Sequence, residues 1–202
     1  MNIIDHPRLY RLLTSLGATG DEELSEVEHE IWSMFGQDAT ILVTDMSSFS
    51  KITKELGIVY CLALITRMQV IVDMLITRHN GKIIKFLADN TFSIFETPDD
   101  ALKCIEQIHK SIRKENQRTP SIWDIELACG IDCGRILNIN NSDLFGDAVN
   151  IAAKMGEDFA EPWEIMMSWR AFERLASQNR KGWTHSIIKI SGIDVDIARK
   201  SF

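Results

Sequence analysis

The stretch IIKFLADNTFSIF, residues 83–95, predicts a β-hairpin whose centre carries charge. Apolar residues run along both arms, whereas Lys85, Asp89 and Asn90 interrupt them near the middle. Ala88, Asp89 and Asn90 suit a tight turn, because Asp and Asn tolerate the backbone conformations that turns require. The question is why a cation and an anion stand four residues apart between two apolar strands.

The segments around this hairpin predict an α+β fold. In chain order we expect a helix over 21–34, a strand over 41–44, a helix over 57–78, the hairpin over 82–86 and 91–95, a helix over 97–116, a strand pair over 123–139, a helix over 145–155, a strand over 164–168, a helix over 169–177 and closing strands over 185–190 and 193–198. This order favours a ferredoxin-like split β-α-β-β-α-β core, an α/β sandwich with helices on one face of the sheet and a C-terminal α-β extension. We expect an N-terminal helical segment over 1–37 and one domain over 38–202.

Composition and charge narrow the class of protein. The 202 residues are 45% hydrophobic with a formal net charge of −7, which argues against a general binder of nucleic acid or anionic membranes but leaves room for a local phosphate site. The most apolar segment, 58–76, contains Arg67, Gln69 and Asp73, so we expect an amphipathic helix and no membrane span. The four cysteines lack a C-x-x-C pair and indicate reduced thiols in a cytoplasmic protein.

Two carboxylates are predicted to meet at one edge of the sheet. Asp45 follows an apolar strand directly, and Asp89 lies at the hairpin tip. The first strand and the hairpin are neighbours in a split β-α-β sheet, so the two carboxylates would lie close together. Because paired carboxylates are costly unless a cation lies between them, a divalent metal is their natural partner. The alternative is that Asp45 only caps the following helix and Asp89 only makes the turn.

The serine-rich segment DMSSFS, residues 45–50, leads from this strand end into a helix. Unpaired backbone N–H groups at such a start bind phosphate oxygens, so Phe49 and Ser50 are candidate substrate contacts. Simple helix capping is the alternative.

The segment DLFGDAVNIAAKM, residues 143–155, is a further candidate. Asn150 and Lys154 stand four apart and share one face of the predicted helix, and Asp143 precedes the glycine turn that leads into it. A solvated helix face is the alternative.

Four motifs in this order resemble the class III nucleotidyl cyclase catalytic domain: TILVTDMSSFS, GKIIKFLADNTFSIF, LACGIDCGR and DLFGDAVNIAAKM. The resemblance covers about residues 38–198. It implies a homodimer with active sites at the interface, which converts a nucleoside triphosphate to a 3′,5′-cyclic monophosphate and pyrophosphate with two Mg²⁺ or Mn²⁺ ions.

The resemblance also implies roles for residues of the hairpin and its surroundings. Asp45 and Asp89 fall on the metal-binding aspartates, with the Met46 carbonyl as a further ligand. Lys85 and Asp143 fall on the base-reading pair of adenylyl cyclases. Asp143 can accept from the adenine N6 amine and Lys85 can donate to N1, so ATP is favoured over GTP.

Four other residues fall on positions that contact ribose or phosphate in the family. Asn150 corresponds to the residue that orients the ribose, and Lys154 to the cation that stabilises the α-phosphate. Arg135 falls on a phosphate-contacting arginine, and Lys189 near a lysine that binds the triphosphate.

Three features depart from the family pattern. Lys154 stands where most members have Arg and loses the bidentate fork, Ala88 stands where they have Gly, and the loop between Arg135 and Asp143 is short. Two alternatives to an adenylyl cyclase stay open, the first favoured by the small size of the chain and the second by Lys154 and Ala88. One is a pyrimidine nucleotide cyclase that makes cUMP or cCMP in anti-phage signalling, and the other is a catalytically degenerate module that binds nucleotide or a regulatory partner. A separate sensor protein is a further expected partner.

Overall fold

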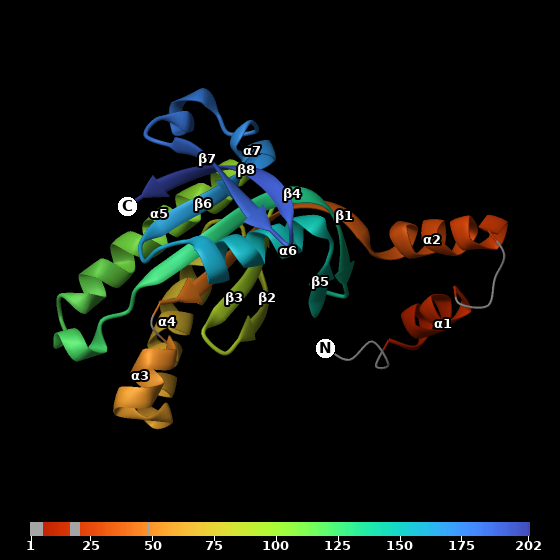
Figure 1. Ribbon diagram of the computed structural model, residues 1–202. Coiled ribbons are helices and arrows are strands. Elements are labelled where there is room, and N and C mark those ends of the chain that lie inside the picture. Colours follow the sequence, from red (N-terminus) through yellow and green to blue (C-terminus); the bar gives the residue numbers. More distant parts are fainter. Residues whose placement is uncertain (1–5, 17–20, 48) are drawn as a thin grey trace.

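A computed structural model of the chain describes residues 6–16, 21–47 and 49–202. These residues form an eight-stranded sheet in the order β2-β3-β1-β4-β6-β8-β7, with β5 paired to β4 (Figure 1). The β4–β6 pair is parallel and the other pairs are antiparallel. The strands are β1 Gly36–Met46, β2 Lys82–Leu87, β3 Asn90–Phe95, β4 Leu127–Ile139, β5 Asp143–Phe145, β6 Glu164–Ser168, β7 Thr184–Ile190 and β8 Ile193–Ser201. Strands β1 to β4, with the helices that connect them, form the predicted split β-α-β-β-α-β core.

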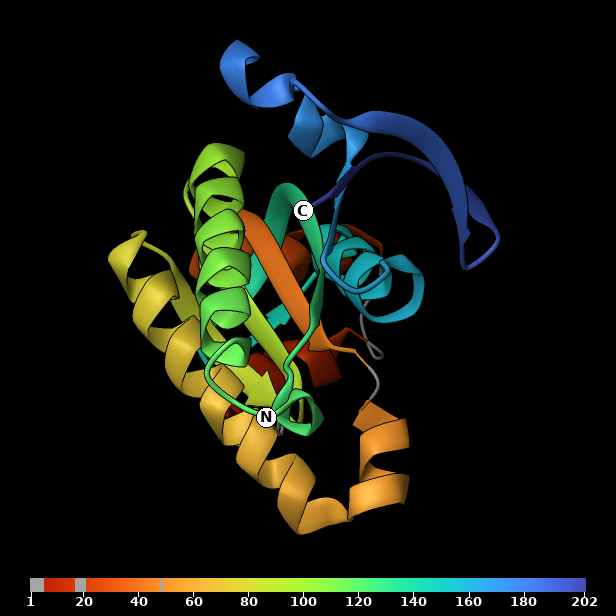
Figure 2. The same cartoon turned by 90° about the vertical axis from the view of Figure 1, so that its left-hand side faces the viewer.

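Helices cover both faces of the sheet. On one face α4 (Ile58–Arg78) and α5 (Pro98–Asn116) pack a core that includes Leu42, and on the other α6 (Asp147–Lys154) packs against Ile41 and Val43. Figure 2 shows α4 and α5 on one side of the strands and α6 on the other. The helices of the split unit, α4 and α5, share one face as expected, whereas α6 of the C-terminal extension covers the second face with its short apolar stripe.

The alternation of β1 decides which face Asp45 uses. Successive side chains of a strand point to opposite faces, so Asp45 projects from the same face as Ile41 and Val43, beside α6.

The hairpin closes through a two-residue turn, because Leu87 pairs with Asn90. Ala88 occupies this turn at φ 53°, a left-handed conformation that costs an L-residue about 1–2 kcal/mol. Its carbonyl accepts a hydrogen bond from Gln69 Nε2 of α4 at 3.4 Å. The Gly-to-Ala departure is thus accommodated with a strained backbone.

The predicted strand pair over 123–139 was wrong, because β4 is one continuous strand of 13 residues. Its glycines do not make a turn. A Cβ on Gly130 would lie 2.0 Å from the Ala152 carbonyl oxygen and 2.8 Å from the Gly156 nitrogen. Glycine is needed there because the backbone of α6 and of the segment that follows it lies directly on the strand.

The remaining elements differ from expectation mainly in length. The predicted helix over 169–177 is short, with α7 spanning only Trp169–Phe172. The N-terminal helices are α1 Pro7–Ser15 and α2 Asp21–Phe35, and α2 runs directly into β1. A further helix, α3 Phe49–Leu56, precedes α4.

Helix α4 is strongly apolar in composition. Among the described residues it is the one helix long and apolar enough to cross a membrane by length and composition, and 33% of its most apolar window is buried. The sequence-based judgement that this segment is too polar to span was therefore too strong. In the fold, α4 instead buries Leu64, Met68 and Val72 against the sheet and α5.

Candidate active site

Lys85 and Asp143 form a direct ion pair on the α6 face of the sheet. Lys85 Nζ lies 2.6 Å from Asp143 Oδ1, and the side chains are 29% and 10% exposed. The ammonium also lies 4.8 Å from the ring centroid of Phe92. Burial alone would raise the pKa of Asp143, but hydrogen bonds from Lys85 and the Leu144 N–H lower it below its ordinary value. Lys85 of β2 and Asp143 of β5, the predicted base-reading pair, thus lie in direct contact.

Asp45 and Asp89 are electrostatic neighbours, as the sequence predicted. Burial, followed by the charges of Asp89, Glu157 and Asp158, raises the pKa of Asp45 to about 7. The pKa of Asp89 is also raised, chiefly by burial. Crowded, half-buried carboxylates of this kind are costly as anions unless a cation neutralises them.

The donor set fits a magnesium-type ion that is completed by substrate. Across residues 6–16, 21–47 and 49–202, no group of three or more His, Cys, Asp or Glu side chains forms a metal cage. Mg²⁺ is commonly held by one or two carboxylates together with phosphate oxygens and water, so the pair Asp45 and Asp89 is sufficient. Met46 follows Asp45 and is buried in the core, and the role of its carbonyl as a metal ligand stays a prediction.

Asn150 and Lys154 lie exposed on α6, on the same side of the sheet as these groups. Lys154 Nζ is held by Asp158 Oδ2 at 2.7 Å, and both side chains are about half exposed (48% and 49%). This partner raises the pKa of Lys154. The cation expected at the α-phosphate is therefore paired within its own helix turn.

A π-helical turn, Met155–Phe159, carries two acidic residues that the sequence reading missed. Glu157 Oε1 accepts a hydrogen bond of 2.9 Å from Asn90 Nδ2, next to Asp89. The turn comes this close because Gly156 has no side chain: a Cβ there would lie 3.0 Å from the Gly130 nitrogen and 3.1 Å from the Val43 oxygen. The sequence signal was GED directly after the helix, a place where π-helical turns and functional residues often coincide.

Two predicted residues, Arg135 and Lys189, are not brought to this face within one chain. Arg135 neighbours Ile136, which packs on the α6 side, so strand alternation turns Arg135 to the opposite face. Its guanidinium lies 4.5 Å from the ring centroid of Trp32. Lys189 is paired with Asp194 at 2.6 Å in the exposed β7–β8 hairpin.

The other two predicted residues, Phe49 and Ser50, begin α3. Phe49 packs its ring against the core beneath α4 and α5. Ser48 and the side chain of Ser50 lie outside the described residues. The roles of all four residues stay predictions.

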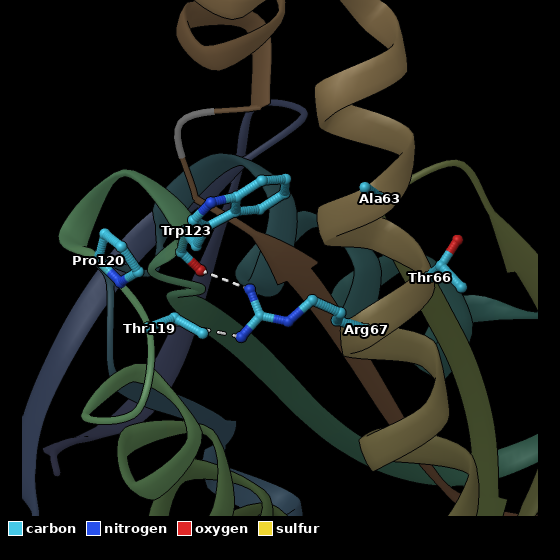
Figure 3. A pocket seen from close by; sticks show the side chains of 6 residues that line it. All are labelled: Ala63, Thr66, Arg67, Thr119, Pro120 and Trp123. Atoms are coloured by element: carbon cyan, nitrogen blue, oxygen red, sulfur yellow. Dashed lines mark hydrogen bonds between the residues drawn. The ribbon is translucent and has the colours of Figure 1, made fainter.

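A cavity of about 510 Å³ lies away from this site (Figure 3). Arg67 of α4 crosses it and donates to the Trp123 carbonyl at 2.9 Å. Because α4 covers the face opposite α6, this cavity is not continuous with the carboxylates or with the Lys85–Asp143 pair.

Comparisons with known proteins identify the family of this chain. The adenylate and guanylate cyclase catalytic domain model matches residues 34–196. A protein named "Putative adenylate cyclase 3" from Rhizobium meliloti (strain 1021) is 28% identical over 130 residues, which are 64% of this chain and 22% of that protein. The match thus spans about a fifth of the relative's length.

Solved structures share the fold at low sequence identity. The guanylyl cyclase Cya2 aligns with a TM-score of 0.70 and 19% identity, over 81% of this chain and 91% of the other. An adenylate/guanylate cyclase/hydrolase from Silicibacter pomeroyi gives 0.68 and 24%, over 83% and 98%. The adenylyl cyclase CyaB from P. aeruginosa gives 0.65 and 18%, over 81% and 94%. These likenesses confirm the predicted α+β fold. Because the family model matches residues 34–196, which are most of this chain, the chain belongs to the family of adenylate and guanylate cyclase catalytic domains.

Proposed function

We propose that this protein converts ATP to 3′,5′-cyclic AMP and pyrophosphate at the interface of a cytoplasmic homodimer, with two Mg²⁺ or Mn²⁺ ions. Membership of the cyclase family supplies the reaction class. The observation that carries the choice of ATP is the Lys85–Asp143 pair, with its Nζ–Oδ1 distance of 2.6 Å.

The polarity of this pair matches adenine. Asp143 is an anionic acceptor because its pKa is lowered, so it suits the exocyclic N6 amine. Lys85 has only donors and suits the ring nitrogen N1. Guanine carries a carbonyl at position six and a protonated N1, so it would require the opposite polarity.

The remaining residues have separate tasks. Asp45 and Asp89 would hold the ions, which supply charge neutralisation at the phosphates and acidify the ribose 3′-hydroxyl when bound. Asn150 orients the ribose by hydrogen bonding, and Lys154 stabilises charge on the α-phosphate. Lys154 must leave Asp158 to do so, which a half-exposed ion pair permits at little cost.

A second copy of the chain completes each site. On one hairpin Lys85 serves the base pocket and Asp89 the metal site, which answers why a cation and an anion stand four residues apart. In a two-fold dimer each protomer gives its carboxylates to one site and its base-reading pair with α6 to the other.

The test is turnover of ATP, GTP, UTP and CTP by purified protein with Mg²⁺ or Mn²⁺, analysed for cyclic products. The expected result is cyclic AMP as the main product. Turnover of UTP or CTP well above that of ATP would replace the proposal with a pyrimidine cyclase.

A catalytically degenerate nucleotide-binding module is the second candidate, and the Lys154–Asp158 pair favours it. Tight ATP binding without cyclisation, together with turnover gained in Lys154→Arg, would establish that reading. Cyclisation of ATP by the native protein would exclude it.

A further inference from the structure

A buried polar network connects β4, α7 and the first turn of α6. Asp132 of β4 has a side chain with 0% exposure, on the sheet face that α6 covers. A carboxylate buried so completely needs ionic and hydrogen-bonding partners, because its transfer from water is costly. Four groups donate hydrogen bonds to this carboxylate. Two are nitrogens of Arg170, Nε at 2.8 Å and Nη2, which together bind both carboxylate oxygens. The other two are the Ser168 hydroxyl and the Cys133 N–H, the latter at 2.7 Å.

The end of β6 holds Arg170 in this geometry. Ser168 ends the strand and caps α7, since its Oγ accepts from the Ala171 N–H at 3.2 Å. The same hydroxyl donates to Asp132. Arg170 therefore projects from the capped start of α7, and two of its nitrogens already bind the buried Asp132. Because the side chain is held in this way, it loses little conformational entropy when it makes a further contact.

The further contact is to α6. Arg170 Nη2 lies 2.8 Å from Asp147 Oδ2, and Asp147 is the first residue of α6. The N-cap residue, Gly146, provides no side-chain hydrogen bond to this helix. Asn150 follows Asp147 by three residues, so the two lie on one side of the helix, one turn apart. The Arg170–Asp147 contact thus holds the turn that presents Asn150.

We infer that Arg170 is a positioning residue, which fixes the rotation and height of α6 through Asp147 and thereby places Asn150 for the reaction. The inference rests on the proposed function, because it concerns the geometry of that same site. It predicts an effect on turnover without a matching effect on stability. Asp147 is 71% exposed and an exposed ion pair adds little stability, whereas a displacement of about 1 Å in a catalytic group can cost up to about 10²-fold in rate.

The deciding variant is Asp147→Ala, which leaves the Asp132–Arg170 pair intact and so keeps the buried charge neutralised. We expect kcat for ATP to fall by about tenfold and KM for ATP to change by less than about twofold. The thermal midpoint should stay within about 2 °C of the native value. Asp147→Glu keeps the carboxylate and should recover part of kcat. Arg174→Met, an exposed charge on the segment after α7, is the matched control and should retain native kcat.

Hydrogen exchange of the amides of residues 149–154 provides a readout that does not need activity. Faster exchange in Asp147→Ala than in native protein is expected whether or not the protein turns over ATP. Native kcat together with native exchange in Asp147→Ala would overturn the inference, as would a loss of stability with kcat unchanged. Absence of any cyclase activity in the native protein would instead overturn the proposed function, and the exchange data would still decide whether Arg170 holds α6.

Discussion

Lys85 Nζ and Asp143 Oδ1 lie 2.6 Å apart although 58 residues separate them in the chain. The contact joins the edge strand β2 to the three-residue strand β5. A preformed donor and acceptor lose less freedom when a ligand arrives, so nucleotide selectivity should depend directly on this pair.

Reversing the charge of Lys85 should therefore weaken the preference for ATP. Lys85→Glu places a second anion beside Asp143 and removes the donor to N1, and we expect kcat/KM for ATP to fall by on the order of 10²-fold. Lys82→Glu, on the same strand and exposed, is the matched control. An unchanged ratio of ATP to GTP turnover in Lys85→Glu would show that the base is read elsewhere.

Asp45 should make the metal-free protein less stable as pH rises. Its pKa is about 7 in the folded protein, against an ordinary value of 3.8, so the folded state keeps a proton that the unfolded state has already lost. The contribution of Asp45 to the free energy of unfolding therefore falls between about pH 4 and pH 7 and is constant above that window. Urea denaturation with chelator at pH 5 and pH 8 measures it.

The comparison protein for that measurement is Asp45→Asn, which carries no titrating group. The stability of Asp45→Asn relative to native protein should increase from pH 5 to pH 8. An equal difference at both pH values would show that Asp45 titrates normally. Mn²⁺ must displace the same proton, so Mn²⁺ affinity of the native protein should rise as pH increases through about 7.

Ala88→Gly should stabilise the fold. Ala88 has φ 53°, which glycine adopts without strain, and the gain outweighs the extra freedom of glycine in the unfolded chain by about 0.5–1 kcal/mol. The midpoint of urea denaturation measures the change. Ala63→Gly, at an exposed position of α4, is a control of opposite sign and should cost about 1 kcal/mol. Destabilisation in both variants would mean that the hairpin turn does not strain Ala88.

Mixing two inactive variants should restore activity if the sites are shared between protomers. Asp45→Ala removes a carboxylate from one half-site and Asn150→Ala removes a group from the other, so a heterodimer keeps one intact site. With random exchange we expect about a quarter of native activity. Each variant alone, treated identically, is the control, and a mixture no more active than its components would indicate sites built within one chain.

The sequence predicted those features that depend on local chemistry. The hairpin, the capped helix at Thr97 and the convergence of Asp45 with Asp89 follow from turn residues, caps and strand adjacency. The pairing of Lys85 with Asp143 came from family resemblance, since no local pattern connects residues so far apart. The segment 123–139 was predicted as a strand pair but contains the single strand β4, in which Gly130 admits the backbone of Ala152 and Gly156.

The acidic turn and the buried network escaped prediction for a different reason. Glu157 gains its importance from a π-helical turn, and Asp132 from an arginine 38 residues away. Both depend on tertiary packing that hydrophobic periodicity does not encode. The sequence also did not predict which face of the sheet Arg135 occupies. Its side chain stacks on Trp32, on the face opposite α6.

The close main-chain approach at Gly130 and Gly156 limits how this domain can diversify. A Cβ on Gly130 would lie 2.8 Å from the Gly156 nitrogen, so a larger residue there would push the strand that neighbours Asp45 away from the segment that follows Lys154. New nucleotide preferences would have to arise from exchanges at the rim, at positions such as Lys85, rather than from a shift of the framework beneath it.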